Sequence, residues 1–124
     1  MTFDELIVQA ENILEDRQIA RNAWAGSVAA ALLSAKGNVY TGVNIDVSSG
    51  MGFCAEQAAI AAMIAAGESK IDKIVAVGRK GIMPPCGRCR EFMNQIHDEN
   101  IEMLAMVAPE QVVKLKDLLP FNWN

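Results

Sequence analysis

The segment FCAEQAAIAAMIAAG, residues 53–67, predicts a helix that carries a single charged side chain among apolar ones. Gly67 is a suitable residue to end this helix, because glycine is common just after the last helical turn. The charged residue is Glu56, two positions after Cys54. Charged side chains avoid buried helices unless a partner compensates them. The segment therefore indicates that Glu56 faces a functional site.

The chain before this segment predicts one helix and a β-hairpin. A capping-box spacing near the N-terminus and a repeat of apolar residues predict a helix over about residues 3–20. Two apolar runs, Val28–Leu33 and Val39–Ile45, are separated by the turn-like sequence SAKGN and predict the two strands of the hairpin.

The chain after the segment alternates strand and helix. Ile74–Val77 has the apolar run of a buried strand, and a second strand is expected over residues 101–108. Two prolines lie between these strands. Since proline is tolerated at a helix start and not in its interior, they predict that a helix begins directly after them, over about residues 86–97. A closing segment, residues 109–124, follows. This order of elements is typical of one three-layer α/β domain, and no repeat or linker divides residues 1–124.

Composition excludes several classes of protein. The 124 residues are 52% hydrophobic and 21% charged, which is enough to form a core and does not indicate disorder. The net charge of −4 argues against nucleic-acid binding, although a local basic groove stays an alternative. The N-terminal sequence lacks the pattern of a signal peptide, and no apolar run reaches the length of a membrane span. A soluble cytoplasmic protein is expected.

The chain has three cysteines, Cys54, Cys86 and Cys89, and this odd number argues against a disulfide framework. Cys86 and Cys89 are three residues apart, so their sulfurs lie on one face of a first helical turn. Cys54 also falls at a predicted helix start, and helix N-termini favour the thiolate that binds metal. Three thiolates with an open fourth position describe a catalytic zinc site. The only histidine, His97, is expected to be a solvated polar residue.

Glu56 would face the open position of such a site, where a carboxylate can take a proton from a metal-activated water and pass it to substrate. Three other interpretations stay open. The C-x-x-C pair is also typical of a thioredoxin-like redox site, although this leaves Cys54 and Glu56 without a role. A structural zinc module would need a fourth ligand, which is not evident. The cysteines can also be inert core residues.

The sequence CAE at 54–56, followed by PCGRC at 85–89, resembles the zinc nucleoside deaminases. The resemblance extends to the small cytidine deaminases through SVAAALLSAKGNVYTGVNI, residues 27–45, and the C-terminal KDLLPFNW. GIMPPCGRCREF is similar both to those enzymes and to blasticidin S deaminase. The resemblance implies a three-layer αβα fold with a mixed five-stranded sheet, Zn²⁺ as the cofactor and a homotetramer.

The implied reaction is hydrolytic deamination of a cytosine nucleoside, as in pyrimidine salvage. A zinc-activated water attacks C4, and Glu56 protonates N3 and then assists the departure of ammonia. The backbone N–H groups of Ala55 and Cys86 are at helix starts, where they can hold polar atoms of the base or the attacking oxygen. Asn44 matches the family asparagine that contacts sugar hydroxyls, and Asp46 falls where the family has a longer glutamate. An Asn/Asp pair is also typical of a turn.

The aromatic residues that surround the nucleoside in cytidine deaminases are absent from this sequence or occur at other positions. Gly26 falls where cytidine deaminases have a phenylalanine beside the nucleoside. Trp24 or Phe53 is expected to form that wall instead, unless both are ordinary core residues. Phe121 and Trp123 loosely match a C-terminal aromatic that covers the nucleoside in a neighbouring subunit of the small enzymes.

The charge around the zinc site is also arranged differently. Gln57 replaces the arginine that commonly follows C-A-E in the family. A nearby cation keeps zinc with three thiolates electrophilic enough to acidify water. Arg88 and Arg90, which flank Cys89, are the candidates for this cation, although a solvated pair of surface charges is the alternative.

The sequence thus predicts a zinc-dependent deaminase of cytidine or deoxycytidine. The alternative substrate is a modified cytosine nucleoside such as blasticidin S. A zinc-binding structural or redox module is the alternative without enzymatic activity.

Overall fold

Seven strands form one mixed sheet in the computed structural model, which describes residues 1–124. The strands are β1 (Arg17–Ala20), β2 (Ala23–Ser34), β3 (Val39–Val47), β4 (Ile71–Gly78), β5 (Gly81–Met83), β6 (Leu104–Ala108) and β7 (Gln111–Lys114). The helices are α1 (Phe3–Glu11), α2 (Ala55–Ala65) and α3 (Gly87–Gln95), with two 3₁₀-helices, η1 (Asp98–Glu102) and η2 (Leu115–Leu118).

The sheet is five strands wide, and two short strands lengthen it. β2 pairs with β3 along one edge, and its other edge pairs first with β1 and then with β4. β4 pairs in turn with β5 and with β6, and β6 pairs with β7. Only the pair β4–β6 is parallel. The expected five-stranded mixed sheet is thus correct in width, but β1 and β5 raise the number of strands to seven.

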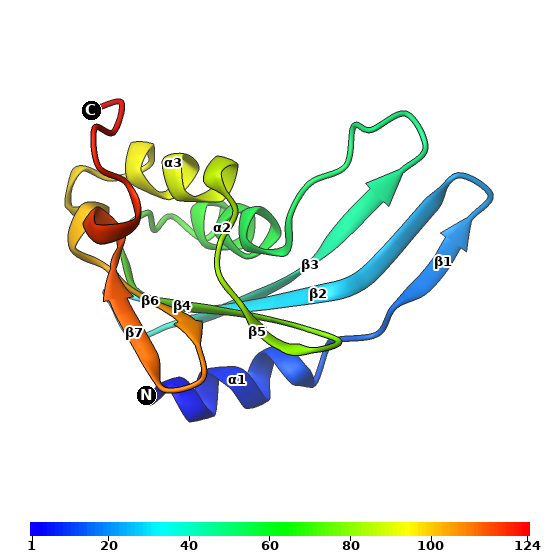
Figure 1. Ribbon diagram of the computed structural model, residues 1–124, viewed down its shortest axis with the longest axis horizontal. Coiled ribbons are helices and arrows are strands. Elements are labelled where there is room, and N and C mark those ends of the chain that lie inside the picture. Colours follow the sequence, from blue (N-terminus) through cyan, green and yellow to red (C-terminus); the bar gives the residue numbers. More distant parts are fainter.

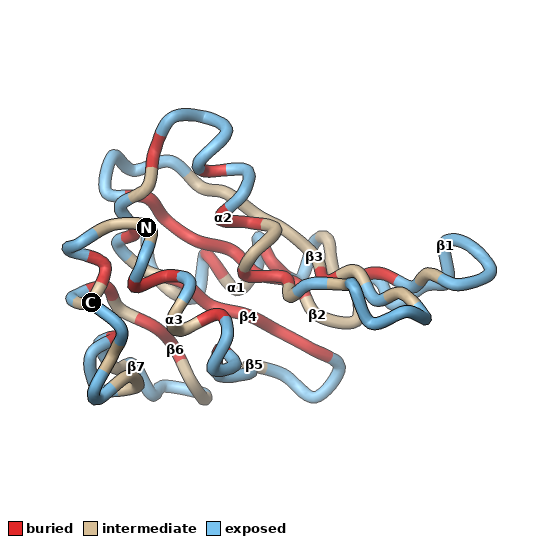
Figure 2. Tube along the Cα trace, turned by 90° about the horizontal axis from the view of Figure 1, so that it is seen from above, coloured by how far each residue is buried: buried red, intermediate tan, exposed pale blue.

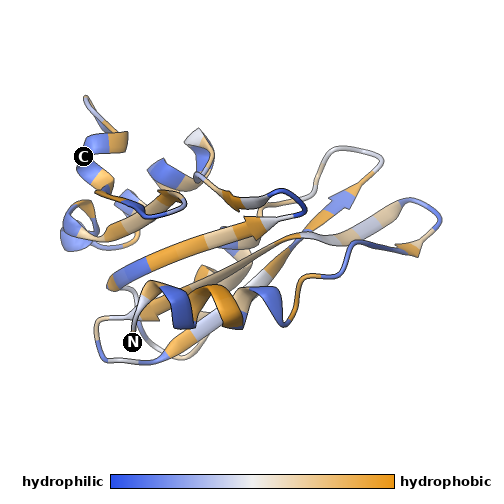
Figure 3. Ribbon diagram, turned by 60° about the horizontal axis from the view of Figure 1, so that its bottom comes forward, coloured by the Kyte–Doolittle hydropathy of each residue, from blue (hydrophilic) through white to orange (hydrophobic).

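Helices cover both faces of the sheet (Figure 1), which confirms the three-layer αβα fold. Alternate residues of β2 point to opposite faces, because side chains of a strand alternate. Ala29, Ala31 and Leu33 pack with Leu6 and Ala10 of α1. Ala30 and Leu32 pack on the other face with residues of α2 and α3, including Ile60, Met63, Cys89 and Met93. Stripes of apolar and polar residues along α1 (Figure 3) agree with a helix that covers the sheet on one side only.

The first helix is shorter than expected. α1 ends at Glu11 and residues 17–20 form β1, so the predicted helix over residues 3–20 is wrong beyond its second turn. Ile13 and Leu14 pack against the core beneath α1, and the Glu15 N–H donates to the carbonyl of Gly26 at 3.1 Å. These contacts with β2 turn the chain back along the sheet, and they override a local apolar repeat that fits a helix.

The other predicted elements are present. The hairpin has Leu33 opposite Val39, and the predicted strand Ile74–Val77 lies within β4. The strand predicted over residues 101–108 is correct only from Leu104, where β6 begins, because the preceding residues up to Glu102 belong to η1. The α2 and α3 helices start directly after Cys54 and Cys86, and Gly67 follows α2 with φ of 92°. β5 and β7 were not expected. Each has only three or four residues, so neither is long enough to give a clear periodic signal.

One end of the sheet projects beyond the helices (Figures 1 and 2). The projecting part consists of β1, the start of β2 and the end of β3, and all four residues of β1 are exposed. Trp24 lies here with 38% of its surface exposed. None of the helices combines the length and the apolarity that crossing a bilayer requires.

A polar cluster ties the β2–β3 hairpin to the end of α2. Glu68 is only 9% exposed, and its Oε2 accepts hydrogen bonds from the Tyr40 hydroxyl at 2.7 Å and from Asn38 Nδ2 at 2.8 Å. Hydrogen bonds from Tyr40, Ser34 and Asn38 lower the pKa of Glu68 to about 2.

We expect this cluster to make the fold sensitive to acid. The pKa of Glu68 is lower in the folded protein than the value of about 4.3 expected for an unfolded chain, so its contribution is complete above about pH 4.3 and is lost as the pH falls towards 2. Glu68→Gln should therefore lower the urea midpoint of unfolding at pH 7 and differ less from wild type at pH 3. Glu11→Gln, at an exposed position, is the control. An equal loss at both pH values would contradict the prediction.

Candidate active site

The starts of two helices meet above one face of the sheet and bring the three cysteines together. Cys54 is the N-cap residue of α2 and Cys86 the N-cap residue of α3. Their Sγ atoms are 3.6 Å apart. Cys89, one turn into α3, is fully buried, and its sulfur completes a group whose three Sγ atoms lie within 4.8 Å of one another. The structure thus brings all three predicted ligands to one point.

This donor set fits Zn²⁺. Tetrahedral zinc with Zn–S bonds of about 2.3 Å separates its sulfur ligands by about 3.8 Å, close to the observed distance between Cys54 and Cys86. The group contains three side chains, as a zinc site with an open position requires. His97 is used elsewhere: its Nδ1 accepts the Glu99 N–H at 3.0 Å and caps η1.

The three thiols do not ionise equally. Burial raises the pKa of Cys89, and the charge of Glu56 adds to this effect. Burial and the hydrogen bond with Cys86 raise the pKa of Cys54. At Cys86 burial also opposes ionisation, but backbone N–H groups at the start of α3 and the neighbouring thiols bring its pKa below the usual value. Holding all three as thiolates therefore requires a cation, which a divalent metal supplies.

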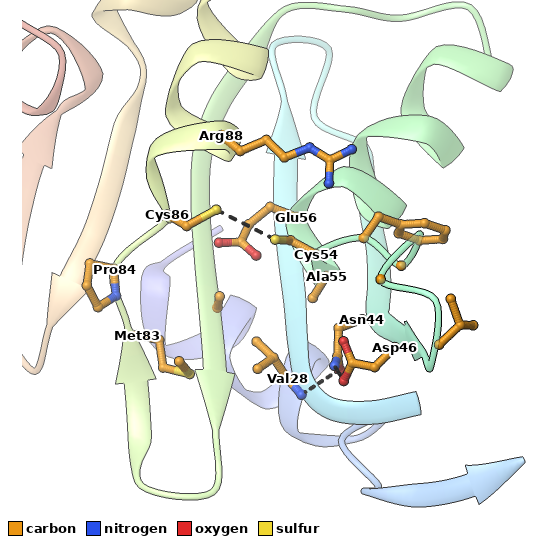
Figure 4. Close-up of a pocket in the computed structure, with 15 residues that line it drawn as sticks. Val28, Asn44, Asp46, Cys54, Ala55, Glu56, Met83, Pro84, Cys86 and Arg88 are labelled. Atoms are coloured by element: carbon orange, nitrogen blue, oxygen red, sulfur yellow. Dashed lines mark hydrogen bonds between the residues drawn. The ribbon is translucent and has the colours of Figure 1, made fainter. Parts of the chain in front are cut away.

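Glu56 lies in the first turn of α2, beside the thiols. Its side chain is 6% exposed and lines a cavity of about 330 Å³. Figure 4 shows its carboxylate beside Cys54 and Cys86. Burial raises the pKa of Glu56, and a hydrogen bond from its own backbone N–H offsets part of the rise. A carboxyl group with a raised pKa at this place is suited to accept a proton and to return it.

The cavity also contains the residues that were predicted to hold a sugar. Asn44 and Asp46, both on β3, line it together with Ala55 at the start of α2. Figure 4 shows Asn44 and Asp46 at the end of the cavity away from the two labelled cysteines. The structure therefore provides a metal-binding end and a polar end in one cavity.

The two arginines of α3 have different surroundings. Arg88 lines the cavity and makes no hydrogen bond or ion pair within the chain, and Figure 4 shows it reaching across the cysteine end. Arg90 donates from Nε to the carbonyl of Pro85 at 2.7 Å and from Nη1 to that of Leu118 at 3.3 Å. Arg90 thus connects the loop before α3 to the C-terminal segment, while Arg88 is free to face the site.

Position 26 has no room for a side chain. Gly26 has φ of 86°, and a Cβ atom there would lie 2.0 Å from the carbonyl oxygen of Glu15. The aromatic side chain of the family is therefore excluded by the backbone of this protein. Phe53 lines the cavity and takes part in its wall, whereas Trp24 does not.

Sequence reasoning missed two other parts of the cavity wall. Met83 and Pro84 line the cavity from β5 and the loop that follows it. Val28, on β2, is a third lining residue. The sequence around the prolines predicts a helix start but not a cavity wall. An apolar residue in a strand has no sequence pattern that indicates which cavity it faces.

Gln57 has a structural role beside Cys54, the first of the three predicted zinc ligands. Its Oε1 accepts the backbone N–H of Cys54 at 3.2 Å, and the Cys54 side chain accepts the Gln57 N–H in return. This reciprocal arrangement is a capping box, which satisfies N–H groups that a helix start leaves without partners. Position 57 thus holds Cys54 in place.

Comparisons with known proteins agree with this geometry. The model of the cytidine and deoxycytidylate deaminase zinc-binding region matches residues 4–105. Cytidine deaminase of Mycobacterium tuberculosis is 34% identical over 96 residues, which are 76% of this chain and 70% of that protein. Cytidine deaminase of Halalkalibacterium halodurans is 33% identical over 97 residues, 75% of this chain and 74% of that protein.

Solved structures resemble the whole chain. The crystal structure of cytidine deaminase from Mycobacterium tuberculosis has a TM-score of 0.82 and 28% identity, covering 100% of this chain and 98% of that one. The enzyme from Mycobacterium leprae has a TM-score of 0.80 and 27% identity, covering 97% and 98%. The family model, the identities and the cluster of three cysteines agree. The chain therefore belongs to the family of zinc-dependent cytidine and deoxycytidylate deaminases.

Proposed function

We propose that this protein converts cytidine or deoxycytidine, with water, into the corresponding uridine and ammonia. One observation carries the proposal: a buried carboxyl group, Glu56, lies beside a site of three sulfur ligands at one end of a cavity whose other end is polar. A structural or redox module has no use for a carboxyl group in that place. The cysteines at 54, 86 and 89 would hold Zn²⁺, which supplies the acidity that lets water react at neutral pH.

The chain's own groups would move the protons. Glu56 accepts a proton from the attacking water, delivers it to ring N3 and assists the departure of ammonia. The backbone N–H groups of Ala55 and Cys86 are at the starts of α2 and α3, where they can bind polar atoms of the base. Asn44 and Asp46 bind the sugar end of the substrate, with the shorter aspartate in place of a glutamate.

Arg88 is our candidate for the cation that balances the thiolates. It faces the cavity without a partner, whereas the guanidinium of Arg90 donates to two carbonyl groups. Three thiolates with one Zn²⁺ carry a net charge of about −1, and a nearby positive charge makes the site more electrophilic. Arg90 would support this arrangement by holding the loop that carries Cys86.

A modified cytosine nucleoside such as blasticidin S is the second candidate substrate. The observation that favours it is the absence of any side chain at Gly26, which removes one wall beside the nucleoside. Ammonia release from cytidine, deoxycytidine, cytosine, dCMP and blasticidin S by the zinc-loaded protein decides between the candidates. Turnover of cytidine or deoxycytidine is the expected result. Turnover of blasticidin S alone would overturn the substrate, and no turnover of any compound would overturn the function.

We also propose that the protein is a cytoplasmic homotetramer that acts as one domain over residues 1–124. A reducing compartment keeps the three thiols available for metal. The outer face of α2 supports self-association. It consists of Ala61, Ala62, Ile64 and Ala65, all exposed and none polar. A helix that is apolar on all sides is typically buried, and small residues allow a second copy to approach closely.

A charge on this outer face should disrupt the assembly. We expect Ile64→Glu, at a side chain that is 45% exposed, to convert the tetramer into smaller species, because an interface would bury the charge without a partner. Analytical ultracentrifugation of the zinc-loaded protein measures the result. Val8→Glu is the matched control, because Val8 is 53% exposed on α1, across the sheet. A tetramer of the Ile64 variant would contradict assembly through α2.

A further inference from the structure

One wall of the cavity is apolar and comes from three neighbouring strands. Val28 of β2, Ala76 of β4 and Met83 of β5 all line the cavity. Met83 lies directly opposite Ala76 in the pairing of β5 with β4, and Val28 lies opposite Gly78 in the pairing of β2 with β4. Opposite residues of antiparallel strands point to the same face of a sheet, and so do residues two apart on one strand. These four positions therefore form one continuous patch on the cavity side of the sheet.

The side chain of Met83 lies over Gly78. A Cβ atom on Gly78 would be 2.6 Å from the Sδ atom of Met83 and 3.6 Å from its Cγ atom. The thioether therefore occupies the space that a side chain at position 78 would need. Met83 is 42% exposed, and a methionine side chain adapts easily to its surroundings. This part of the wall is thus a flexible side chain that rests on a glycine, and its position depends on that glycine.

The proposed reaction fixes which edge of the base meets this wall. C4 of the ring lies at the cysteine end of the cavity and N1, which carries the sugar, at the polar end, so the ring has one edge on each side. The edge with N3 and the C2 carbonyl needs polar partners, which Glu56 and the N–H of Ala55 provide at the start of α2. The other edge, C5 and C6, has only C–H groups. It is directed to the apolar side, where Figure 4 shows Met83 and Pro84 across the cavity from Ala55.

We propose that Met83 limits the size of a substituent at C5 of the cytosine ring, and that Gly78 sets how far the thioether extends into the cavity. This inference rests on the proposed deamination of a cytosine nucleoside, and it names a substrate that the site discriminates against, a nucleoside of 5-methylcytosine. Hydrolytic deamination of 5-methyldeoxycytidine gives thymidine and ammonia, so the reaction is the same and only the methyl group differs. One such group in an apolar pocket changes kcat/KM by about 10- to 200-fold.

Three variants of the zinc-loaded protein test the inference by their selectivity, which is kcat/KM for deoxycytidine divided by kcat/KM for 5-methyldeoxycytidine. Met83→Ala should lower the selectivity at least about tenfold, because it removes the thioether. Gly78→Ala should raise it about threefold or more, since a methyl group on the sheet lifts the thioether into the cavity. The φ of Gly78 is not positive, so alanine fits its backbone. The double variant should match Met83→Ala within about threefold, since position 78 acts through the missing thioether.

Two further variants separate the size of the side chain from other effects. Met83→Leu keeps a side chain of similar volume and should stay within about threefold of the wild-type selectivity. Met51→Ala removes a methionine that is 80% exposed and does not line the cavity, so this matched control should not change the selectivity. Thermal unfolding and zinc content show that each variant is folded and loaded.

Binding of the two products gives a measurement without the chemical step. Calorimetry of the zinc-loaded protein measures the Kd values of deoxyuridine and thymidine, which differ by the same methyl group at C5. Met83→Ala should shift the ratio of these Kd values at least about tenfold in favour of thymidine. Met83→Leu should leave the ratio within about threefold of wild type.

The outcomes distinguish the inference from the function beneath it. If wild type releases no ammonia from deoxycytidine, the proposed function fails. If wild type is active and the selectivity of Met83→Ala or of Gly78→Ala equals that of wild type, the inference is overturned and the function stands. An effect of Gly78→Ala that persists in the double variant also overturns it. If Gly78→Ala does not fold, the comparison of Met83→Ala with Met83→Leu decides, because only the first should accept the methyl group.

Discussion

Replacing Glu56 with glutamine is expected to lower kcat for cytidine by about 10²- to 10⁴-fold while zinc stays bound. The three sulfur ligands remain in place, and glutamine has nearly the same shape as glutamate. What is lost is the group that accepts a proton and returns it. Because Glu56 is 6% exposed and lies beside the cysteines, a proton acceptor from solution cannot readily take over its role in proton transfer.

Stability and metal content make this experiment decisive. Burial raises the pKa of Glu56 on folding, so the ionised carboxylate opposes folding at neutral pH, and a neutral glutamine should leave the Tm of the metal-free protein unchanged or raise it. Zinc content and kcat are measured on the same preparations. Glu110→Gln, at an exposed turn, is the control and should behave as wild type. A Glu56→Gln variant within tenfold of wild-type kcat would contradict the proton-transfer role.

The second large effect is expected at Gly42, where β3 touches α2. A Cβ atom on Gly42 would lie 2.4 Å from the backbone nitrogen of Ala59 and 2.6 Å from the Cβ of Ala58. These atoms belong to the helix and its short side chains, so they cannot swing aside. Gly42→Ala should therefore push α2 away from the sheet and lower the free energy of unfolding by about 1–3 kcal/mol.

The same substitution should weaken zinc binding, because Cys54 is the N-cap residue of α2 and would move with the helix. Urea unfolding of the metal-free protein measures the stability, and competition with a chelator measures the affinity for zinc. Gly87→Ala is the matched control, since nothing lies within 4 Å of its added Cβ and it sits in the first turn of α3. Alanine there should stabilise the protein by up to about 1 kcal/mol. An unchanged stability of Gly42→Ala would show that α2 does not need this close approach.

Local sequence patterns, which involve only a few consecutive residues, predicted much of the part of the site that contains Glu56 and the three cysteines. Proline before Cys86 and a glycine after the helix at 55–65 mark helix boundaries locally, and the structure has the helices there. The spacing of the cysteines placed two sulfurs on one helical turn. The isolated charge of Glu56 in an apolar helix indicated that it faces a site, and the structure places it in the cavity beside those sulfurs.

Contacts between distant parts of the chain decided the rest. Residues 17–20 became a strand because β2 supplied partners for their backbone, which no local pattern reveals. The same fold leaves no room for a side chain at Gly26, and it supplies hydrogen-bond acceptors for both amide hydrogens of Asn44. It also gives the two arginines of α3 different surroundings, since the carbonyl partners of Arg90 include Leu118. Helix boundaries and cysteine spacing are properties of a few consecutive residues, so the sequence by itself determined them. The partner of a polar side chain is set by which strands pair and in which register, and only the tertiary structure decides that.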